Sequence, residues 1–323
     1  TAGQGTRMKS KTPKVLHKIG GLPLIGHLLH LTTDLEIDSP NVIIGGNAQN
    51  VESYVKTHKN QAICLRQDEP LGSGHALKCA ENSLIDHTGN LLVLCGDVPF
   101  IKKNTVLTML NELDLGADLV VLGFKTDKPT NYGRMVIKDG NRLKEIIEEK
   151  EASKAQKKIK ICNAGVYCGS AKLIFSLLSN LQNENKSDEY YLTDIVKATT
   201  DKQLNTKVVI TNMSETQGIN TKKDLAAGEL YFQNQLRQRA LENGITLIDP
   251  KTVYFSYDTE IGKDTVIHPN VILGPSVKIQ ENVEILSFSH LEGCTIEKGS
   301  KIGPFARVRP GTYIEEDVKI GNF

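Results

Sequence analysis

The chain has 323 residues, with 39 Lys or Arg against 38 Asp or Glu, so its formal net charge is +1. This length is enough for two domains with cores of their own, and the near-zero charge excludes the basic footprint of nucleic-acid or anionic-membrane binding. Apolar residues make up 39% of the chain and no run of them reaches the length of a membrane-spanning helix, so the composition predicts a soluble globular protein.

The chain opens with a glycine-containing loop, Ala2–Met8. Gly3 and Gly5 allow the backbone N–H groups to approach a ligand closely. Arg7 and Lys14 add positive charge, so the loop predicts a site for the triphosphate of a nucleotide. On these residues alone, an ordinary turn with two solvated cations is the simpler interpretation.

Both ends of the sequence look cut. No apolar strand precedes the glycine loop, although loops of this type normally follow one, and residues 320–323 stop within a repeating pattern. We therefore expect a fragment of a longer protein. Because a core strand is missing, we expect this fragment to be unstable or inactive.

Up to residue 124, apolar runs alternate with helical segments. The expected strands cover 41–46, 62–65, 90–95 and 117–124, and the expected helices cover 21–34, 48–58, 75–85 and 103–114. Continuous apolar strands separated by helices indicate a parallel sheet covered on both faces. Since ligands bind beyond the carboxyl ends of such strands, the loops 3–14, 67–74 and 96–97 should converge.

After residue 130 the alternation is less regular. Strands are expected directly after 131–134 and over 159–168 and 208–211, with a polar surface loop at 182–188 and a helix over 191–200. The segment 143–149 carries an acidic end. Residues 221–243 suit one long helix, which we interpret as a connector between domains.

From residue 261 onward, aliphatic residues recur every six positions, with one five-residue step. They are Ile261, Ile267, Leu273, Ile279, Ile285 and Leu291, then Ile296, Ile302, Val308, Ile314 and Ile320. This hexapeptide period predicts a solenoid whose coils stack aliphatic side chains in one column. A meander of short strands would need a period of two instead.

Asp97 ends an apolar strand, so its carboxylate should point into the crevice at the strand ends. A lone Asp there is more often the N-cap of the following helix. Together with the glycine loops and the amide of Asn220, however, it indicates a metal site. Mg²⁺ fits best, because it takes one or two protein oxygens and completes its shell with phosphate and water.

The sequence shows no Ser/His/Asp or Cys/His arrangement. A phosphate monoester is already mostly ionised at neutral pH, so its attack on the α-phosphorus of a nucleoside triphosphate needs positioning and charge neutralisation but no base. Gln67 and Gly72-Ser73 could read a base edge, although a loop amide and a helix N-cap at Ser73 compete with that reading. Glu148 could bind sugar hydroxyls and Asn163 an amide or hydroxyl, and each alone is more often surface or turn chemistry.

The ordered motifs closely resemble those of the bacterial bifunctional N-acetylglucosamine-1-phosphate uridylyltransferase/glucosamine-1-phosphate acetyltransferases, over essentially the whole chain. The matching stretches are 2–8, 13–17, 71–76, 96–99, 132–134, 163–165, 189–194, 218–220, 302–311 and 321–323. The resemblance implies an α/β nucleotidyltransferase domain, a Rossmann-like mixed sheet with helices on both faces, followed by a left-handed parallel β-helix. Separately, the six cysteines show no C-x-x-C spacing and mostly lie inside apolar runs, which indicates a reduced, cytoplasmic setting. The resemblance implies an enzyme that converts UTP and N-acetylglucosamine 1-phosphate to UDP-N-acetylglucosamine and pyrophosphate. The corresponding domain boundaries are 1–222, 223–243 for the helical linker, and 244–323.

The resemblance also implies site roles. The nucleotide and its phosphates would be contacted by Thr1, Ala2, Gly3, Arg7 and Lys14. Uracil would be held by Gln67, Gly72 and Ser73, and the ribose and metal side lined by Cys95, Gly96 and Asp97. The amino sugar would meet Gly133, Glu148 and Asn163, with Tyr191 and Thr193 near its acetamido group. Mg²⁺ would be held by Asp97 and Asn220.

Some positions depart from the family pattern. Ser73 stands where Thr is usual, and Thr1, Pro70, Cys95 and Glu151 also differ. In the solenoid, Arg309 matches a substrate-binding arginine of the acetyltransferase, which uses acetyl-CoA and glucosamine 1-phosphate. Its other site positions lie past residue 323, so that site is incomplete. The family assembles as a homotrimer through the solenoid.

Two other interpretations stay open. One is a different sugar-1-phosphate nucleotidylyltransferase that uses glucose or mannose phosphate and another base. The other is a non-catalytic solenoid scaffold that keeps only a relic of nucleotide binding.

Overall fold

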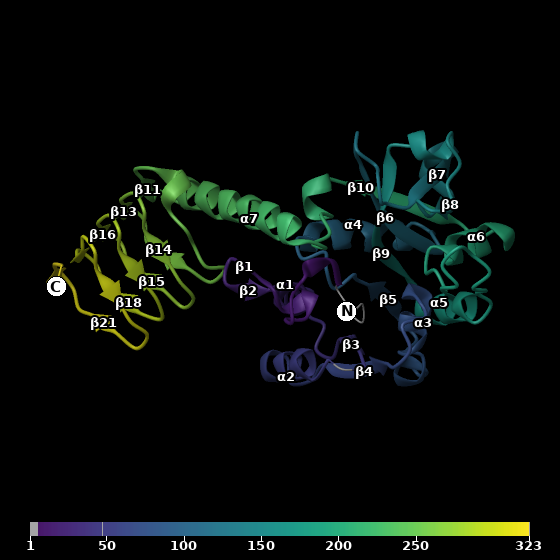
Figure 1. Ribbon diagram of the computed structural model, residues 1–323, viewed down its shortest axis with the longest axis horizontal. Coiled ribbons are helices and arrows are strands. Elements are labelled where there is room, and N and C mark those ends of the chain that lie inside the picture. Colours follow the sequence, from purple (N-terminus) through teal and green to yellow (C-terminus); the bar gives the residue numbers. More distant parts are fainter. Residues whose placement is uncertain (1–5, 47, 323) are drawn as a thin grey trace. The chain divides into compact units, whose positions relative to one another are not determined.

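The computed structural model describes residues 6–46 and 48–322 (Figure 1). The chain divides into two compact units, Thr1–Leu16 with Leu24–Thr221, and His17–Pro23 with Lys222–Phe323. The domain boundaries 1–222, 223–243 and 244–323 stay a prediction. Within the described part of the chain, no helix combines the length and apolar character needed to cross a bilayer.

The first unit is built on a six-stranded mixed sheet, seen around β6 in Figure 1. Its order is β5 (Asn90–Val93), β9 (Ile161–Ser170), β6 (Leu119–Lys125), β10 (Thr206–Thr211), β8 (Arg142–Ile147) and β7 (Arg134–Lys138). β10 is parallel to β6, whereas β9 runs antiparallel between β5 and β6. The expectation of a wholly parallel sheet through residue 124 is therefore wrong, because a later strand inserts between its members.

Helices cover both faces of this sheet. Successive side chains of a strand point to opposite faces, so one strand contributes to the core on each side. Along β6, Leu119 and Val121 belong to one core cluster, and Val120 and Leu122 to another. The first cluster contains residues of α3 (Ser73–Lys78), α5 (Ala171–Leu178) and α6 (Asp194–Asp201), and the second contains residues of α4 (Lys103–Asp114). The expected helices over 75–85 and 191–200 are shorter, and α5 was not expected.

A separate parallel pair joins β3 (Asn41–Gly45) to β4 (Ile63–Gln67). Val42 and Ile44 of β3 pack with residues of α1 (Leu24–Asp34) and α2 (Gln49–His58) in a further core cluster. Short 3-10 turns complete the described chain at η1 (Thr6–Met8), η2 (Lys14–Leu16), η3 (Asn82–Leu84), η4 (Asp139–Asn141), η5 (Gln156–Lys158), η6 (Met213–Glu215) and η7 (Pro250–Thr252).

A small hairpin precedes α1, where the sequence predicted the start of a helix at residue 21. β1 (Lys18–Ile19) pairs antiparallel with β2 (Leu22–Pro23) around Gly20 and Gly21. Both glycines have positive φ, +55° and +80°, which is the requirement of a two-residue hairpin turn of type I′. The two glycines therefore make a turn between strands, and the helix begins only at Leu24.

The hairpin belongs to the second unit, together with α7 (Lys222–Glu242) and the rest of the chain after it. The Gly20 amide donates to Glu229 Oε2 at 2.8 Å, and the Gly20 carbonyl accepts from the Tyr257 amide at 2.8 Å. A Cβ at Gly20 would lie 2.2 Å from Phe232 Cε1. Glycine is therefore required here both for the turn and for the close approach to α7.

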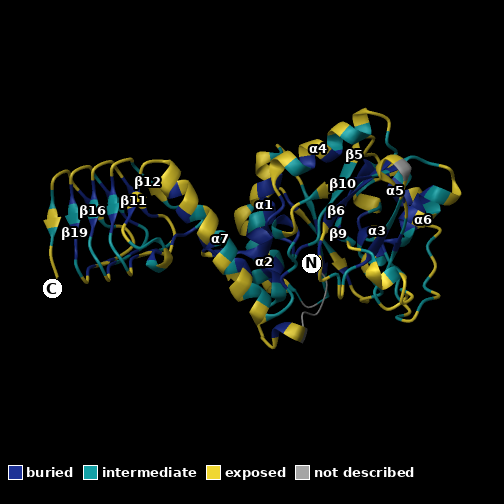
Figure 2. Cartoon of the chain, turned by 90° about the horizontal axis from the view of Figure 1, so that it is seen from above, coloured by how far each residue is buried: buried dark blue, intermediate teal, exposed yellow. Residues whose placement is uncertain are grey.

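The rest of the second unit is a solenoid of stacked coils (Figure 2). Three parallel sheets form its faces. They are β11 (Thr246–Leu247), β13 (Val266–Ile267), β16 (Glu284–Ile285), β19 (Lys301–Ile302) and β22 (Lys319–Ile320); β12 (Glu260–Ile261), β15 (Lys278–Ile279), β18 (Thr295–Ile296) and β21 (Tyr313–Ile314); and β14 (Ile272–Leu273), β17 (His290–Leu291) and β20 (Arg307–Val308).

The aliphatic residues of the hexapeptide period point into the solenoid and form its core. They stand in three columns, one for each face, because each coil takes one six-residue step along every face. Ile267 pairs with Ile285, for example, whereas Leu273 pairs with Leu291. The expectation of one column is therefore wrong, and the expectation of a parallel β-helix is confirmed.

Candidate nucleotide and sugar-phosphate site

Four polar side chains from three distant segments meet at one point of the first unit. Lys14 Nζ donates to Asp97 Oδ2 at 2.6 Å and to Asn220 Oδ1 at 3.2 Å. Arg7 Nη2 donates to the same oxygen of Asn220 at 2.8 Å. The Ile219 amide donates to the Asp97 carbonyl at 2.8 Å, which ties the 97 loop to the 220 loop. Of the three loops expected to converge, 3–14 and 96–97 therefore meet at Lys14 and Asp97, with Asn220 beside them. The contacts of the 67–74 loop lead instead to residues 190–192.

This cluster contains two oxygens that could hold a divalent cation. A carboxylate oxygen and an amide oxygen are both directed at one cation, the Lys14 ammonium, and the Lys14 and Asp97 side chains are only 17% and 22% exposed. Among the described residues, no group of three or more His, Cys, Asp or Glu could hold a metal. Two oxygens suit Mg²⁺, which keeps water and phosphate as its other ligands. Asp97 is not a helix cap, since the N-cap of α4 is Lys102.

Residues 1–5, and with them Thr1, Ala2 and Gly3, lie outside the described residues. Cys95 and Gly96 lead directly into Asp97 from the end of β5. The Cys95 thiol donates to the Gly165 carbonyl at 3.2 Å. Burial and then the negative charge of Asp97 raise the pKa of Cys95 to about 12, although the Lys14 charge opposes them. The thiol is therefore protonated at neutral pH and is no nucleophile.

Asn163, Gly165 and Tyr167 lie where the pairing of β9 with β6 is irregular, because Tyr167 pairs with Val121 whereas Asn163 pairs with Gly123. Asn163 Oδ1 accepts from the Gly165 amide at 2.9 Å, and its Nδ2 donates to Tyr167 Oη at 2.9 Å. Gly165 has a φ of +75°, which is the left-handed region that glycine tolerates. The Asn163 side chain is thus held from two sides beside the Cys95 loop.

Gly133, Glu148 and Asn163 lie together, as the resemblance implied. A Cβ at Gly133 would lie 3.6 Å from both Asn163 Cβ and Glu148 Oε1. The Asn163 amide donates to the Gly133 carbonyl at 2.9 Å, and Thr193 Oγ1 donates to Glu148 Oε1 at 3.0 Å. Burial raises the pKa of Glu148, the Thr193 hydrogen bond opposes this, and the charges of Asp194 and Glu189 add to it.

Gln67, Gly72 and Ser73 form a third contact group. Gln67, at the end of β4, is buried, and its Nε2 donates to the Gly72 carbonyl at 3.1 Å. Gly72 has a φ of +106° and is the N-cap of α3, so Ser73 is not the cap. Ser73 Oγ instead accepts from the Leu192 amide at 3.0 Å. Arg309 belongs to the other unit, where it is exposed and its carbonyl accepts from the Thr312 amide.

Three residues that support these groups were not among the expected site residues: Gly165, Tyr167 and Tyr190. Gly165 and Tyr190 lie in the matching stretches 163–165 and 189–194, which gave them no role of their own. The backbone contact of Tyr190 with the 71–74 loop could not be predicted, because it joins segments more than a hundred residues apart.

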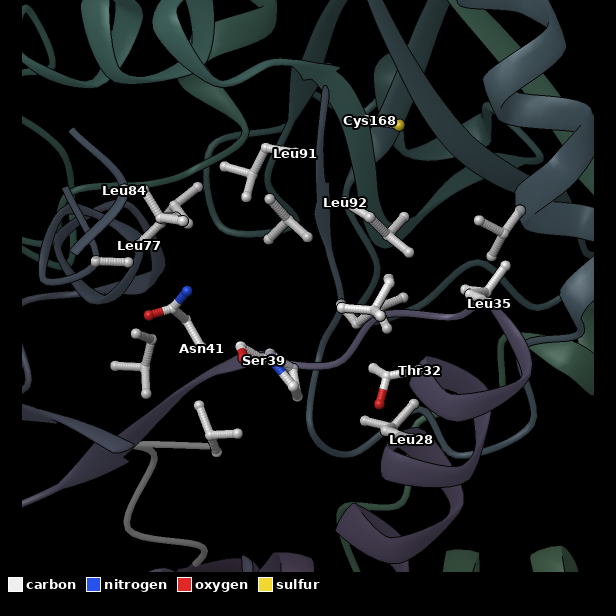
Figure 3. A pocket seen from close by; sticks show the side chains of 18 of the residues that line it. Leu28, Thr32, Leu35, Ser39, Asn41, Leu77, Leu84, Leu91, Leu92 and Cys168 are labelled. Atoms are coloured by element: carbon white, nitrogen blue, oxygen red, sulfur yellow. The ribbon is translucent and has the colours of Figure 1, made fainter. Parts of the chain in front are cut away.

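An apolar cavity of about 500 Å³ lies between β3 and β5 (Figure 3). Leu28, Leu77, Leu84, Leu91 and Leu92 line it, with Asn41, Ser39 and Thr32 as polar groups. Its described lining contains no Asp, Glu, Lys or Arg, so it cannot balance the charge of a triphosphate. The cluster around Lys14 and Asp97 is the better candidate for phosphate chemistry.

Comparison with known proteins agrees with both units. Residues 1–162 match the MobA-like NTP transferase domain family, and residues 258–293 match six bacterial transferase hexapeptide repeats. Among solved structures, a UDP-glucose pyrophosphorylase complexed with UDP-glucose covers 72% of this chain and 96% of its own length, with a TM-score of 0.58 at 17% identity. An inositol-1-phosphate CTP transferase from T. maritima covers 65% of this chain and 83% of its own length, with a TM-score of 0.52 at 17% identity. These likenesses show the nucleotidyltransferase fold.

Curated relatives match along the whole chain. The bifunctional protein GlmU of Roseobacter denitrificans is 43% identical, covering 100% of this chain and 71% of the relative. The GlmU proteins of Zymomonas mobilis and Bartonella quintana are each 41% identical, covering 100% of this chain and 72% of theirs. The family and the fold class expected from the motifs are confirmed, and the chain belongs to the GlmU family of bifunctional transferases.

Proposed function

We propose that the first unit transfers the uridylyl group of UTP to N-acetylglucosamine 1-phosphate, giving UDP-N-acetylglucosamine and pyrophosphate. Membership of the GlmU family supports this reaction. The observation that carries its chemistry is the meeting of Arg7 and Lys14 with Asp97 and Asn220. Two fixed cations beside an oxygen pair suit a triphosphate that brings its own negative charge.

The reaction proceeds by direct displacement. An oxygen of the sugar phosphate attacks the α-phosphorus of UTP, the bond to the β-phosphate oxygen breaks, and pyrophosphate leaves with the electron pair. No proton has to be removed from the attacking group, so the residues act by positioning and by charge. Arg7 and Lys14 neutralise phosphate oxygens, while Gln67 with the backbone at Gly72 holds the base.

Mg²⁺ is the proposed cofactor, held by Asp97 and Asn220. When bound, it neutralises charge on the triphosphate oxygens. Lys14, whose ammonium contacts both residues, would supply a fixed positive charge beside the phosphates. On the acceptor side, Glu148 accepts hydrogen bonds from sugar hydroxyls. Asn163 is held by Gly165 and Tyr167, and the side-chain amide atoms that these contacts leave available form further hydrogen bonds with the sugar.

The second unit supports two further proposals. The parent protein acetylates glucosamine 1-phosphate with acetyl-CoA, and Arg309 contributes to that substrate site. The chain assembles as a homotrimer through the solenoid, whose exposed Phe288 and Phe305 rings stack with centroids 5.1 Å apart, since aromatic residues are enriched at interfaces. The proposed setting is the cytoplasm, and no nucleic acid or membrane partner is proposed.

The test is pyrophosphate release from UTP, N-acetylglucosamine 1-phosphate and MgCl₂. Asp97→Asn keeps the shape of the side chain but removes its charge, so the turnover number should fall by about 100-fold or more. Asp127→Asn is the matched control, because Asp127 is exposed and pairs with exposed Lys160 in a surface contact at 2.7 Å, and its activity should be that of the wild type.

Two results would reject the proposal. One is an Asp97→Asn variant that keeps wild-type turnover. The other is a nucleotide panel in which dTTP, ATP or GTP is preferred to UTP, which would assign the chain to another sugar-1-phosphate nucleotidylyltransferase. A trimer that binds no UTP would instead indicate a scaffold.

A further inference from the structure

Residues 71–74 and 190–192 are joined by three hydrogen bonds, and we call this pair of segments the clasp. The Tyr190 amide donates to the Leu71 carbonyl at 2.8 Å, and the Gly74 amide donates to the Tyr190 carbonyl at 2.8 Å. The third bond uses a side chain, because the Leu192 amide donates to Ser73 Oγ at 3.0 Å. The clasp therefore joins two segments that are distant in the sequence, since Ser73 and Leu192 are 119 residues apart.

Two glycines allow this close approach. A Cβ at Gly72 would lie 2.6 Å from the Tyr190 carbonyl oxygen and 2.9 Å from its amide nitrogen. A Cβ at Gly74 would lie 2.9 Å from Leu181 Cδ1 and 3.0 Å from the Tyr190 carbonyl oxygen. The sequence Gly-Ser-Gly thus places a hydroxyl between Gly72, which admits no side chain, and Gly74, where a Cβ would crowd its neighbours.

Each side of the clasp leads to a different part of the proposed site. On one side, the Gly72 carbonyl accepts from Gln67 Nε2 at 3.1 Å. On the other side, Leu192 precedes Thr193, whose hydroxyl donates to Glu148 Oε1 at 3.0 Å. Leu192 is buried, with 6% exposure. If the Ser73 hydroxyl were removed, water could not readily replace it, and leaving the Leu192 amide without an acceptor would cost free energy.

From these contacts we infer that Ser73 is a positioning residue for the sugar side of the site. Its hydroxyl holds the Leu192 amide, which fixes Thr193 and, through Thr193, the carboxylate of Glu148. This role rests on the proposed function of the first unit and differs from the direct contact with uracil that the family resemblance implies for Ser73.

The experiment compares Ser73→Ala and Ser73→Thr with the wild type by steady-state kinetics, varying each substrate. In Ser73→Ala, the KM for N-acetylglucosamine 1-phosphate should rise about tenfold, because one buried amide loses its acceptor, while the KM for UTP stays within about twofold. Ser73→Thr keeps a hydroxyl and should restore the wild-type value. Ser153→Ala is the matched control, since Ser153 Oγ accepts from the Gln156 amide at 3.3 Å in an exposed turn, and it should change neither constant.

A second measurement follows the hydrogen bond itself. Amide hydrogen exchange of the peptide containing Leu192 should be faster in Ser73→Ala and normal in Ser73→Thr. Should Ser73→Ala not fold, Ser73→Cys replaces it with a weak acceptor and should show the same change in KM to a smaller degree.

The inference is overturned if Ser73→Ala raises the KM for UTP alone, if both constants rise equally, or if neither changes. In each of these cases the wild type still makes UDP-N-acetylglucosamine, so the proposed function stands. A wild-type chain that does not turn over UTP with N-acetylglucosamine 1-phosphate overturns the proposed function itself, and faster exchange of the Leu192 amide in Ser73→Ala then still tests the positioning contact.

Discussion

Glu148 and Glu149 are sequence neighbours with opposite surroundings. Burial raises the pKa of Glu148, and the hydrogen bond from Thr193 only partly opposes it. Burial also acts to raise the pKa of Glu149, but its hydrogen bond and ion pair with Arg134, at 2.5 Å, outweigh burial and lower it. The two residues therefore offer a pair of variants with opposite expected pH dependence.

We predict that Glu148→Gln is more stable than the wild type above the folded-state pKa, because the wild type must bury a charge there. A raised folded-state pKa means that the folded chain binds the proton more tightly, so wild-type stability falls as the pH rises through that pKa. The difference in stability between Glu148→Gln and the wild type should shrink as the pH falls toward 4.5, the ordinary pKa of a glutamate. Urea unfolding between about pH 8 and about pH 5 measures it.

The control is Glu149→Gln, whose expected sign is reversed. A lowered pKa contributes stability above the ordinary value, and this is lost as the pH falls through the folded-state pKa. Glu149→Gln should thus be less stable than the wild type at neutral pH and approach it in acid. Two variants with the same constant offset at every pH would contradict both assignments.

The meeting of Lys14, Asp97 and Asn220 could be predicted from the sequence, because loops at the carboxyl ends of strands converge. The contacts of Ser73 and Asn163 could not. Each depends on which backbone group the fold brings beside the side chain, and a motif of residue types does not contain that information. The same motif, Gly-Ser-Gly, is compatible with a base contact and with a contact to Leu192.

At the scale of elements, the solenoid could be predicted best. Its six-residue period is a local property that every coil repeats, so the core positions, from Ile261 to Ile320, follow by counting. The hairpin at 18–23 was mistaken for the start of a helix, since Gly-Gly suits both a helix entry and a type I′ turn. The antiparallel course of β9 was missed because strand order is decided by contacts far apart in the chain.

Gly262 is expected to be indispensable to the stacking of two coils. A Cβ there would lie 2.4 Å from the Glu281 amide nitrogen and 2.6 Å from the Gln280 carbonyl carbon, both backbone atoms of the next coil. We predict that Gly262→Ala destabilises the chain by about 1–3 kcal/mol, as overpacking does, and lowers the midpoint of thermal unfolding.

Gly274 provides the control, because it has the same place after a strand and its amide also donates to the next coil. A Cβ at Gly274 would be no closer than 3.2 Å to its neighbours, one of which is the flexible Glu292 side chain. Gly274→Ala should therefore cost less than half as much. Equal losses for the two variants would show that the close approach at Gly262 is not what limits stability.

At the scale of the whole molecule, the proposed homotrimer makes a further prediction. Phe288 and Phe305 are 54% and 60% exposed and stack on each other at corresponding turns of consecutive coils. Replacing both by Ser should weaken assembly on the order of tenfold or more, because buried aromatic anchors carry much of the energy of an interface.

Sedimentation equilibrium measures this assembly directly. Ile85→Ser is the control, because Ile85 is 74% exposed and belongs to the other unit. It should leave the oligomeric state of the wild type unchanged. A double Phe variant that assembles like the wild type would place the interface elsewhere, and a wild type that is monomeric would reject the trimer.

The hairpin at His17–Pro23 has a consequence for anyone who dissects this molecule. The chain passes between its two compact units three times, after Leu16, after Pro23 and after Thr221. A single cut after Thr221 therefore leaves Gly20 on one piece and its partners Glu229 and Tyr257 on the other. In pieces produced separately, Gly20 would lack its hydrogen-bond partners Glu229 and Tyr257. Pieces co-expressed in one cell could form these hydrogen bonds by associating.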